Sequence, residues 1–334
     1  MYKSTETVLC MPAIEELTRF GVIDDNSKET AWKKAEICSE SISSGKADGI
    51  VEIYSKNLSY RRGISNTKDW SWPYINGINH IKIAAPIIIK PIIHGASVVI
   101  HSTTKYIGGH GTSIGGIIID SGNFNWEEFK ERQPLLNNPD PSYHGAIWTE
   151  AVKPLGPIAF ILKARVTLLR DIGGAMSPFN AFQFIQGLET LPLRIREQCK
   201  NAKLVAEHLS SLKSVSKVIY PSLFTGENKK RVDTYLDNSY GALVGFEIDG
   251  GIENGKKFID SLKLFYHVAN IGDARSLAIH PASTTHSQLS EEDKLRAGVN
   301  NSYIRLSIGI EHIDDIICDL DGALNKATKY IKAA

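Results

Sequence analysis

Apolar residues recur at helical spacing in two stretches of the second half of the chain. A repeat of three or four positions places them on one face of a helix. The two stripes are Ala202, Val205, Ala206, Leu209 and Leu212, and then Ile313, Ile316, Ile317, Leu320, Ala323, Leu324 and Ala327. Residues 243–248 and 303–308 have the composition of strands. We therefore expect helices packed on one face of a mainly antiparallel sheet.

The strand predicted at 303–308 has two unlike faces. Ile304, Leu306 and Ile308 alternate with Tyr303, Arg305 and Ser307. Because successive side chains of a strand point to opposite faces, burial of the apolar set leaves Arg305 on the other face. On this pattern alone, a surface salt bridge at Arg305 is the default interpretation.

The middle of the chain predicts one buried strand followed by helices. Residues 96–100 are small, β-branched and apolar, as in a buried strand. The Asn-, Pro- and Asp-rich segment 133–145 predicts a surface loop, and 151–169 predicts a helix. A second, long helix is expected to begin near Ser177 and to link two domains.

Composition excludes several classes of function. The 334 residues include 38 Lys and Arg against 37 Asp and Glu, a formal net charge of +1, which indicates neither a nucleic-acid nor a membrane partner. No apolar run reaches the roughly 18 residues of a membrane span, and the N-terminus lacks a secretion-signal pattern. The four cysteines have no zinc or redox spacing. We expect a cytoplasmic protein without a metal site.

A single lysine follows the predicted strand 96–100, between hydroxyl side chains and glycines. The run is His101-Ser102-Thr103-Thr104-Lys105-Tyr106-Ile107-Gly108-Gly109-His110-Gly111-Thr112. A lysine amine that loses its proton can form a Schiff base with a carbonyl or with pyridoxal phosphate, and the hydroxyls of Ser102 and Thr104 suit a phosphate. The spacing fits neither the Walker pattern nor GxGxxG. An ordinary turn with an exposed lysine is the alternative.

The segment 102–111 closely resembles the cofactor-lysine motif of the Cys/Met-metabolism family of pyridoxal-phosphate enzymes. Its continuation through Gly116 looks like the O-acetylhomoserine sulfhydrylase branch, and so do segments 268–274, 280–289 and 304–311. The resemblance runs from about Ala84 to Lys326 and stops upstream of His80. These motifs follow one another in the family's order, so the resemblance is specific.

The resemblance implies the α/β fold of fold type I pyridoxal-phosphate transferases, which is like that of aspartate aminotransferase. We expect a divergent N-terminal segment at 1–80, the remainder of an incomplete cofactor-binding large domain at 81–190, and a C-terminal α+β small domain at 191–334. By the same resemblance the chain is expected to form a homo-oligomer, a homotetramer in the family, in methionine biosynthesis. The family's glycine turn and ring-stacking tyrosine cannot be located in 1–80.

Residue by residue, the resemblance implies five site residues. Lys105 would bind pyridoxal 5'-phosphate covalently and then act as acid and base on the substrate. Ser102 and Thr104 would bind the phosphate. Arg305 would bind the substrate carboxylate, for which a guanidinium is well shaped, and Asn270 would lie beside it. Alone, Asn270 would be interpreted as a turn residue.

One position departs from the family pattern. When the sequences are aligned on Pro86, His80 stands where the family has the aspartate that pairs with the ring nitrogen. The negative charge of that aspartate keeps the ring nitrogen protonated and makes the ring an electron sink. A histidine cannot supply this charge.

Three hypotheses follow. The first is a sulfhydrylase-like enzyme that makes homocysteine from O-acetylhomoserine and sulfide by γ-replacement. The second is a catalytically impaired family remnant, and the third is a cystathionine synthase or γ-lyase on the same scaffold.

Overall fold

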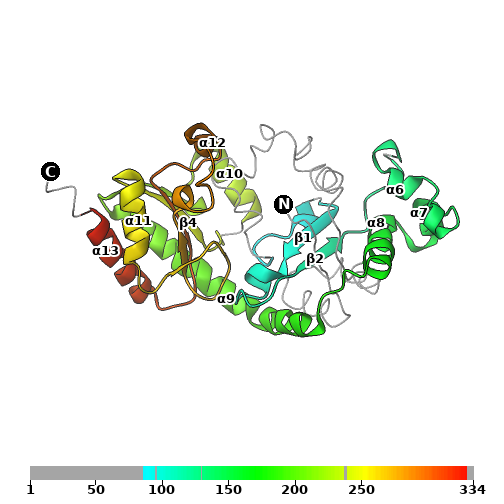
Figure 1. Cartoon of the computed structure of the whole chain (residues 1–334), viewed down its shortest axis with the longest axis horizontal. Coiled ribbons are helices and arrows are strands. Elements are labelled where there is room, and N and C mark those ends of the chain that lie inside the picture. Colours follow the sequence, from blue (N-terminus) through cyan, green and yellow to red (C-terminus); the bar gives the residue numbers. More distant parts are fainter. Residues whose placement is uncertain (1–85, 95, 129, 237–238, 329–334) are drawn as a thin grey trace. The chain divides into compact units, whose positions relative to one another are not determined.

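The computed structural model describes residues 86–94, 96–128, 130–236 and 239–328 (Figure 1). They belong to two compact units. The first contains Lys90–Gly108 and Thr112–Glu189, apart from the undescribed positions within these ranges. The second contains residues 86–89, Gly109–Gly111 and the described part of 190–328. His80 lies outside the described residues.

The first unit begins with a strand pair around the lysine segment. After the 3₁₀ turn η1 (Pro91–His94), β1 (Val98–Ser102) pairs antiparallel with β2 (Gly116–Asp120). The register runs from Val98 opposite Asp120 to Ser102 opposite Gly116. The apolar residues of both strands are buried apart from Ile100, which is partly buried. The buried strand predicted at 96–100 is therefore present, shifted two residues toward the lysine.

Short helical segments make up most of the remaining first unit. They are η3 (Lys130–Arg132), α6 (Pro134–Asn137), η4 (Pro141–Tyr143), α7 (Trp148–Ala151), η5 (Lys153–Leu155), α8 (Ala159–Lys163) and η6 (Ala164–Asp171). The helix predicted over 151–169 is present only from Ala159 onward, where α8 continues directly into η6. Pro154 and Pro157 lack the N–H that a continuous helix needs, so regular α-helix resumes only at Ala159. The predicted loop 133–145 contains α6 and η4.

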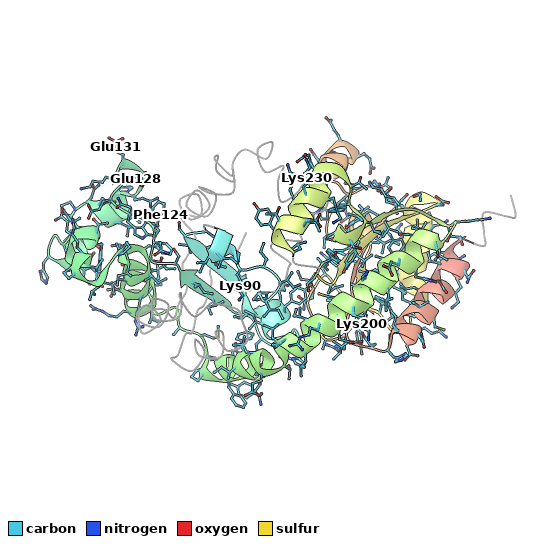
Figure 2. The ribbon with its side chains drawn as sticks, turned by 180° about the vertical axis from the view of Figure 1, so that it is seen from behind. Lys90, Phe124, Glu128, Glu131, Lys200 and Lys230 are labelled. Atoms are coloured by element: carbon cyan, nitrogen blue, oxygen red, sulfur yellow. The ribbon has the colours of Figure 1, made fainter. Side chains whose placement is uncertain are left out.

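The long helix predicted to begin near Ser177 is α9 (Pro178–Ser211), with 34 residues. Its first turns belong to the first unit, up to Glu189, and the rest belongs to the second. The predicted stripe from Ala202 to Leu209 is fully buried. The opposite face is polar: Lys200, labelled in Figure 2, is exposed and pairs with Glu197.

A mixed five-stranded sheet forms the centre of the second unit. Its strand order is β3-β4-β7-β6-β5, antiparallel except between β5 and β6. The strands are β3 (Val215–Ile219), β4 (Leu243–Ile248), β5 (Tyr266–His267), β6 (Leu277–Ile279) and β7 (Tyr303–Ser307). The other elements are η7 (Pro221–Leu223), α10 (Gly226–Tyr235), α11 (Gly251–Ser261), η8 (Pro281–Ser283), α12 (Glu291–Arg296) and α13 (Ile313–Thr328).

One face of this sheet packs against helices. Val244, Phe246 and Ile248 of β4 join a core with Ile304 and Leu306 of β7, and residues of α9, α11 and α13 complete it. The predicted packing of helices on a mainly antiparallel sheet is confirmed. The alternation predicted in β7 is also confirmed, because Ile304 and Leu306 are fully buried in that core and Arg305 is half-buried.

Candidate active site

Lys105 lies in a tight turn at the end of β1. Ser102 is the last residue of β1, and the π-helical turn η2 (Thr103–Ile107) follows at once. Lys105 interrupts the helical backbone of this turn, with φ −83° and ψ −126°. The Ser102 side chain makes no capping bond to the turn. Ser102, Thr104 and Lys105 are all half-buried. The structure therefore brings together the three residues predicted around the cofactor.

Two hydrogen-bonded contacts with Gly115 close the loop that contains Lys105. The Gly115 N–H donates to Thr104 Oγ1 at 3.0 Å, and the Thr103 N–H donates to the Gly115 carbonyl at 3.0 Å. Thr103 Oγ1 is buried, and no described residue bonds to it. A Cβ at Gly115 would lie 2.7 Å from that hydroxyl oxygen, so this position accepts only glycine without rearrangement.

Helix α9 packs directly on the backbone after Lys105. A Cβ at Gly187 would lie 2.4 Å from the Ile107 carbonyl oxygen and 2.6 Å from that of Gly108. Phe184, one turn earlier, contacts Gly108. The Gln183 side chain accepts hydrogen bonds from Ser113 and, at 3.2 Å, from Thr112. Sequence reasoning missed these helix residues, because only a glycine inside a helical pattern could have pointed to them.

The second unit brings Arg305 and Asn270 together. Arg305 pairs with Gly245 of β4 and with Ile279 of β6, on the sheet face opposite the core. Its Nη2 donates to the Asn270 carbonyl at 3.2 Å. The Tyr303 ring lies over Gly245, whose Cβ would be 2.6 Å from the phenol oxygen. Gly245 therefore makes room for the Tyr303 ring, which a side chain at this position would displace.

Histidines near both groups of site residues are biased toward the neutral form. Burial lowers the pKa of His101, the neighbour of Ser102, to about 4. Burial also lowers the pKa of His286, and the charge of Arg305 lowers it further. Burial raises the pKa of Tyr303, against the opposing effect of Arg305. His286 and Tyr303, the two titratable neighbours of Arg305, are thus both biased toward their neutral forms.

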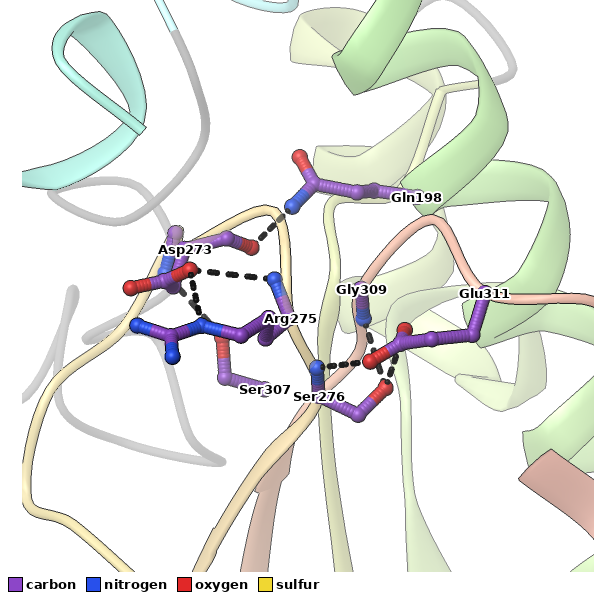
Figure 3. A network of polar contacts seen from close by, with 8 residues as sticks. Gln198, Asp273, Arg275, Ser276, Ser307, Gly309 and Glu311 are labelled. Atoms are coloured by element: carbon purple, nitrogen blue, oxygen red, sulfur yellow. Dashed lines mark hydrogen bonds and ion pairs between the residues drawn. The ribbon is translucent and has the colours of Figure 1, made fainter. Parts of the chain in front are cut away.

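A polar network supports the loop that carries Asn270 (Figure 3). Gln198 donates to the Asp273 carbonyl at 2.6 Å, and the Asp273 carboxylate accepts from the Arg275 backbone at 3.0 Å. The Ser276 backbone and hydroxyl both donate to Glu311, at 2.6 and 2.9 Å. These bonds fix the loop against α9 and against the segment after β7.

The residues present suit part of pyridoxal phosphate. A half-buried lysine amine can react with the aldehyde, and two neighbouring hydroxyls can donate to the phosphate. The Ser102 hydroxyl makes no capping hydrogen bond to the turn. The position that would face the ring nitrogen, His80, lies outside the described residues.

Within the described part of the chain, no group of three or more His, Cys, Asp or Glu residues is placed to hold a metal ion. None of the described helices is long and apolar enough to cross a membrane.

The family model for Cys/Met metabolism PLP-dependent enzymes matches residues 81–325. The chain belongs to this family. A solved structure of a putative O-acetylhomoserine (thiol)-lyase from Campylobacter jejuni, which holds a pyridoxyl-lysine phosphate, is 37% identical with a TM-score of 0.64. The match covers 76% of this chain and 62% of that one. The fold type I prediction for this Cys/Met metabolism enzyme is confirmed.

Curated relatives extend the comparison. The O-acetyl-L-homoserine sulfhydrylase of Leptospira meyeri is 53% identical over 246 residues, which cover 72% of this chain and 55% of that protein. The chain thus spans about half the length of this Cys/Met metabolism relative. The homocysteine/cysteine synthase of Kluyveromyces lactis is 36% identical and matches 89% of this chain and 72% of that protein. Because residues 81–334 alone cannot supply 89% of the chain, this alignment extends upstream of residue 81, where the family model begins.

Proposed function

We propose that this chain is an O-acetylhomoserine sulfhydrylase-like transferase that uses pyridoxal 5'-phosphate to make homocysteine from O-acetylhomoserine and sulfide. In this γ-replacement the Cγ–O bond breaks, acetate leaves, and the sulfur forms the new bond to Cγ. The observation that carries the proposal is the closed turn that places Lys105 directly after the hydroxyl residues Ser102 and Thr104. The names of the relatives support the choice of substrate.

Each site residue has a role in this proposal. Bound pyridoxal phosphate supplies an electron sink for the substrate carbons. Ser102 and Thr104 bind its phosphate, and the Lys105 amine holds the cofactor and then moves protons on the substrate. The half-buried Arg305 guanidinium binds the substrate carboxylate with two parallel hydrogen bonds, and Asn270 orients that carboxylate.

The wider assignments are proposals of the same kind. We propose residues 81–190 as the remainder of the large domain and 191–334 as the small domain. The substrates are small molecules, and the resemblance favours a homotetramer that acts in the cytoplasm. Scattered cysteines without paired spacing agree with a reducing compartment.

The first test is covalent trapping on the purified chain. Pyridoxal phosphate is added, the visible absorption is recorded, borohydride is applied, and the modified peptide is mapped. We expect the label on Lys105, its loss in Lys105→Ala, and its retention in Lys200→Ala, which removes an exposed lysine on α9. Label scattered over surface lysines would contradict the proposal and support an impaired remnant.

The second test identifies the reaction. O-acetylhomoserine is supplied with sulfide, with cysteine or alone, and the products are separated. Homocysteine from sulfide is the expected outcome. Cystathionine from cysteine, or elimination without added sulfur, would instead assign the cystathionine synthase or γ-lyase alternative.

A further inference from the structure

A buried guanidinium lies beneath the glycine turn that follows Lys105 in the sequence. Arg194 of α9 is only 5% exposed. Its Nε donates to Thr190 Oγ1 at 3.1 Å, one helical turn earlier. Burial lowers its pKa to about 10, and the charge of Asp273 opposes this shift. Arg194 is therefore still a cation at neutral pH, and a buried cation is costly unless its surroundings compensate it.

The turn is shaped to receive this guanidinium. Gly109 has φ +72°, and a Cβ there would lie 2.3 Å from Arg194 Nη1 and 2.5 Å from Cζ. The guanidinium thus occupies the space that a side chain at residue 109 would need, so only glycine fits there. The Gly109 carbonyl accepts a hydrogen bond of 2.8 Å from the Ala274 N–H. Gly109 is joined to Lys105 by only the residues 106–108.

The same part of α9 holds the Asn270 loop. Gln198, one turn after Arg194 and fully buried, donates to the Asp273 carbonyl at 2.6 Å. The Asp273 side chain is also buried. A Cβ at Gly111 would lie 3.1 Å from Asn270 Nδ2 and 3.3 Å from Asp273 Oδ2. The glycine turn and the Asn270 loop therefore meet on one helix face, and the Asn270 carbonyl binds Arg305.

We infer that Arg194, with Asp273 as its counter-charge, is a positioning residue that holds the glycine turn after Lys105 and the Asn270 loop in one arrangement. The inference deepens the proposed function, on which its catalytic part rests. Arg194 does not touch the substrate in this assignment. It acts through Gly109 on the glycine turn and through the Asn270 loop on Arg305.

The test compares Arg194→Lys with Arg196→Lys, a matched control two residues away on the exposed side of the same helix. Lysine keeps the charge but loses the planar fork. Amide hydrogen exchange is followed by mass spectrometry in peptides that cover 108–111 and 270–275. We expect exchange there to be about tenfold faster in Arg194→Lys, as loss of one hydrogen bond to a charged group would produce, and unchanged in Arg196→Lys.

Asp273→Asn is the second variant, because it keeps the shape and removes the counter-charge. Because the Asp273 carboxylate also pairs with Arg275, exchange at 270–275 changes in this variant for a local reason, and faster exchange at 108–111 is the expected sign of the role of Arg194, whether or not Arg194→Lys folds. In the enzyme assay, activity is normalised to the label trapped on Lys105. We expect KM for O-acetylhomoserine to rise by about tenfold and kcat to change less, because the variants misplace Arg305, which binds the substrate carboxylate.

The outcomes separate the two proposals. Exchange at 108–111 that stays at the wild-type rate in both Arg194→Lys and Asp273→Asn would overturn the positioning role, even in an active enzyme. If the wild type makes no homocysteine, the proposed function fails, and the exchange data still decide the role of Arg194. An unchanged KM for O-acetylhomoserine in Arg194→Lys would also contradict the positioning role of Arg194.

Discussion

Gly115 donates its backbone N–H to the hydroxyl of Thr104 at 3.0 Å, across a loop that contains Lys105. The Thr104 oxygen thus closes the loop as an acceptor, and its O–H, which donates to the Gly115 carbonyl at 3.4 Å, can turn to a phosphate without loss of the acceptor role. A threonine hydroxyl offers one donor and two acceptor sites, so both tasks are compatible. One side chain connects the backbone of the loop with the proposed cofactor site.

Replacement of Thr104 by valine should therefore have two effects. The Gly115 N–H loses its acceptor, which costs about 1–3 kcal/mol if the group stays buried, and the phosphate loses a donor. We expect a lower unfolding midpoint and weaker binding of pyridoxal phosphate. Thr104→Ser keeps the hydroxyl and should remain close to wild type. Denaturant titration and an absorbance titration with the cofactor measure the two effects, and equal results for valine and serine would refute this account.

Gly187→Ala should destabilise the protein, although alanine is the better helix former. The added methyl group would meet the Ile107 and Gly108 carbonyls at 2.4 and 2.6 Å. Overpacking of this kind typically costs about 1–3 kcal/mol. Gly322→Ala is the matched control, because Gly322 also lies inside a helix and nothing lies within 4 Å of its added Cβ. That variant should gain up to about 1 kcal/mol. Chemical denaturation of both variants gives the signs, and a stabilising Gly187→Ala would show that α9 does not press on the turn.

Arg305→Lys should weaken binding of the substrate without weakening binding of the cofactor. Lysine keeps the positive charge but cannot form the two parallel bonds of a guanidinium with a carboxylate. We expect KM for O-acetylhomoserine to rise by about tenfold or more, because hydrogen bonds to charged groups contribute about 1.5–3 kcal/mol. Trapping on Lys105 should stay at the wild-type level. Arg196→Lys, on an exposed part of α9, serves as the control. If KM equals that of wild type, Arg305 does not bind the substrate carboxylate and has a structural role only.

Stability should fall as the pH is lowered below about 6.5, the ordinary pKa of histidine. His280 is 1% exposed, and its Nε2 lies 3.0 Å from the Asn301 carbonyl. Burial lowers its pKa, so the unfolded chain takes up a proton at a higher pH than the folded chain does. The free energy of unfolding then decreases from pH 6.5 downward until the folded-state pKa is reached. The pKa of His101, lowered to about 4, contributes with the same sign.

His280→Gln tests this pH dependence, since the amide keeps a donor for Asn301 and does not titrate. The unfolding midpoint is measured between pH 8 and pH 5 for both proteins. A shallower slope is expected in the variant below pH 6.5, and the remaining slope is assigned to His101 and His286, whose pKa values are also lowered. A slope identical to that of wild type would mean that His280 is not the buried neutral group.

The local patterns of the sequence were sufficient for several structural features. The stripe from Ala202 to Leu209 specified a helix face, and alternation in β7 placed Arg305 opposite the core. These features are readable because the period of a helix or strand is a property of neighbouring residues. The helix predicted over 151–169 is continuous only from Ala159, because the prolines near its start forbid a helix over the whole stretch.

The sequence by itself determined the chemical groups of the site: a lysine after two hydroxyl residues, an arginine on the strand face opposite the apolar residues, and glycines after the lysine. Only the tertiary structure decided that Arg194 lies against Gly109 and that Gly187 lies against Ile107. Such contacts join residues that are far apart along the chain, and a glycine shows no side-chain pattern from which its neighbour could be inferred. Close approach of two backbones depends on packing, which no local period encodes.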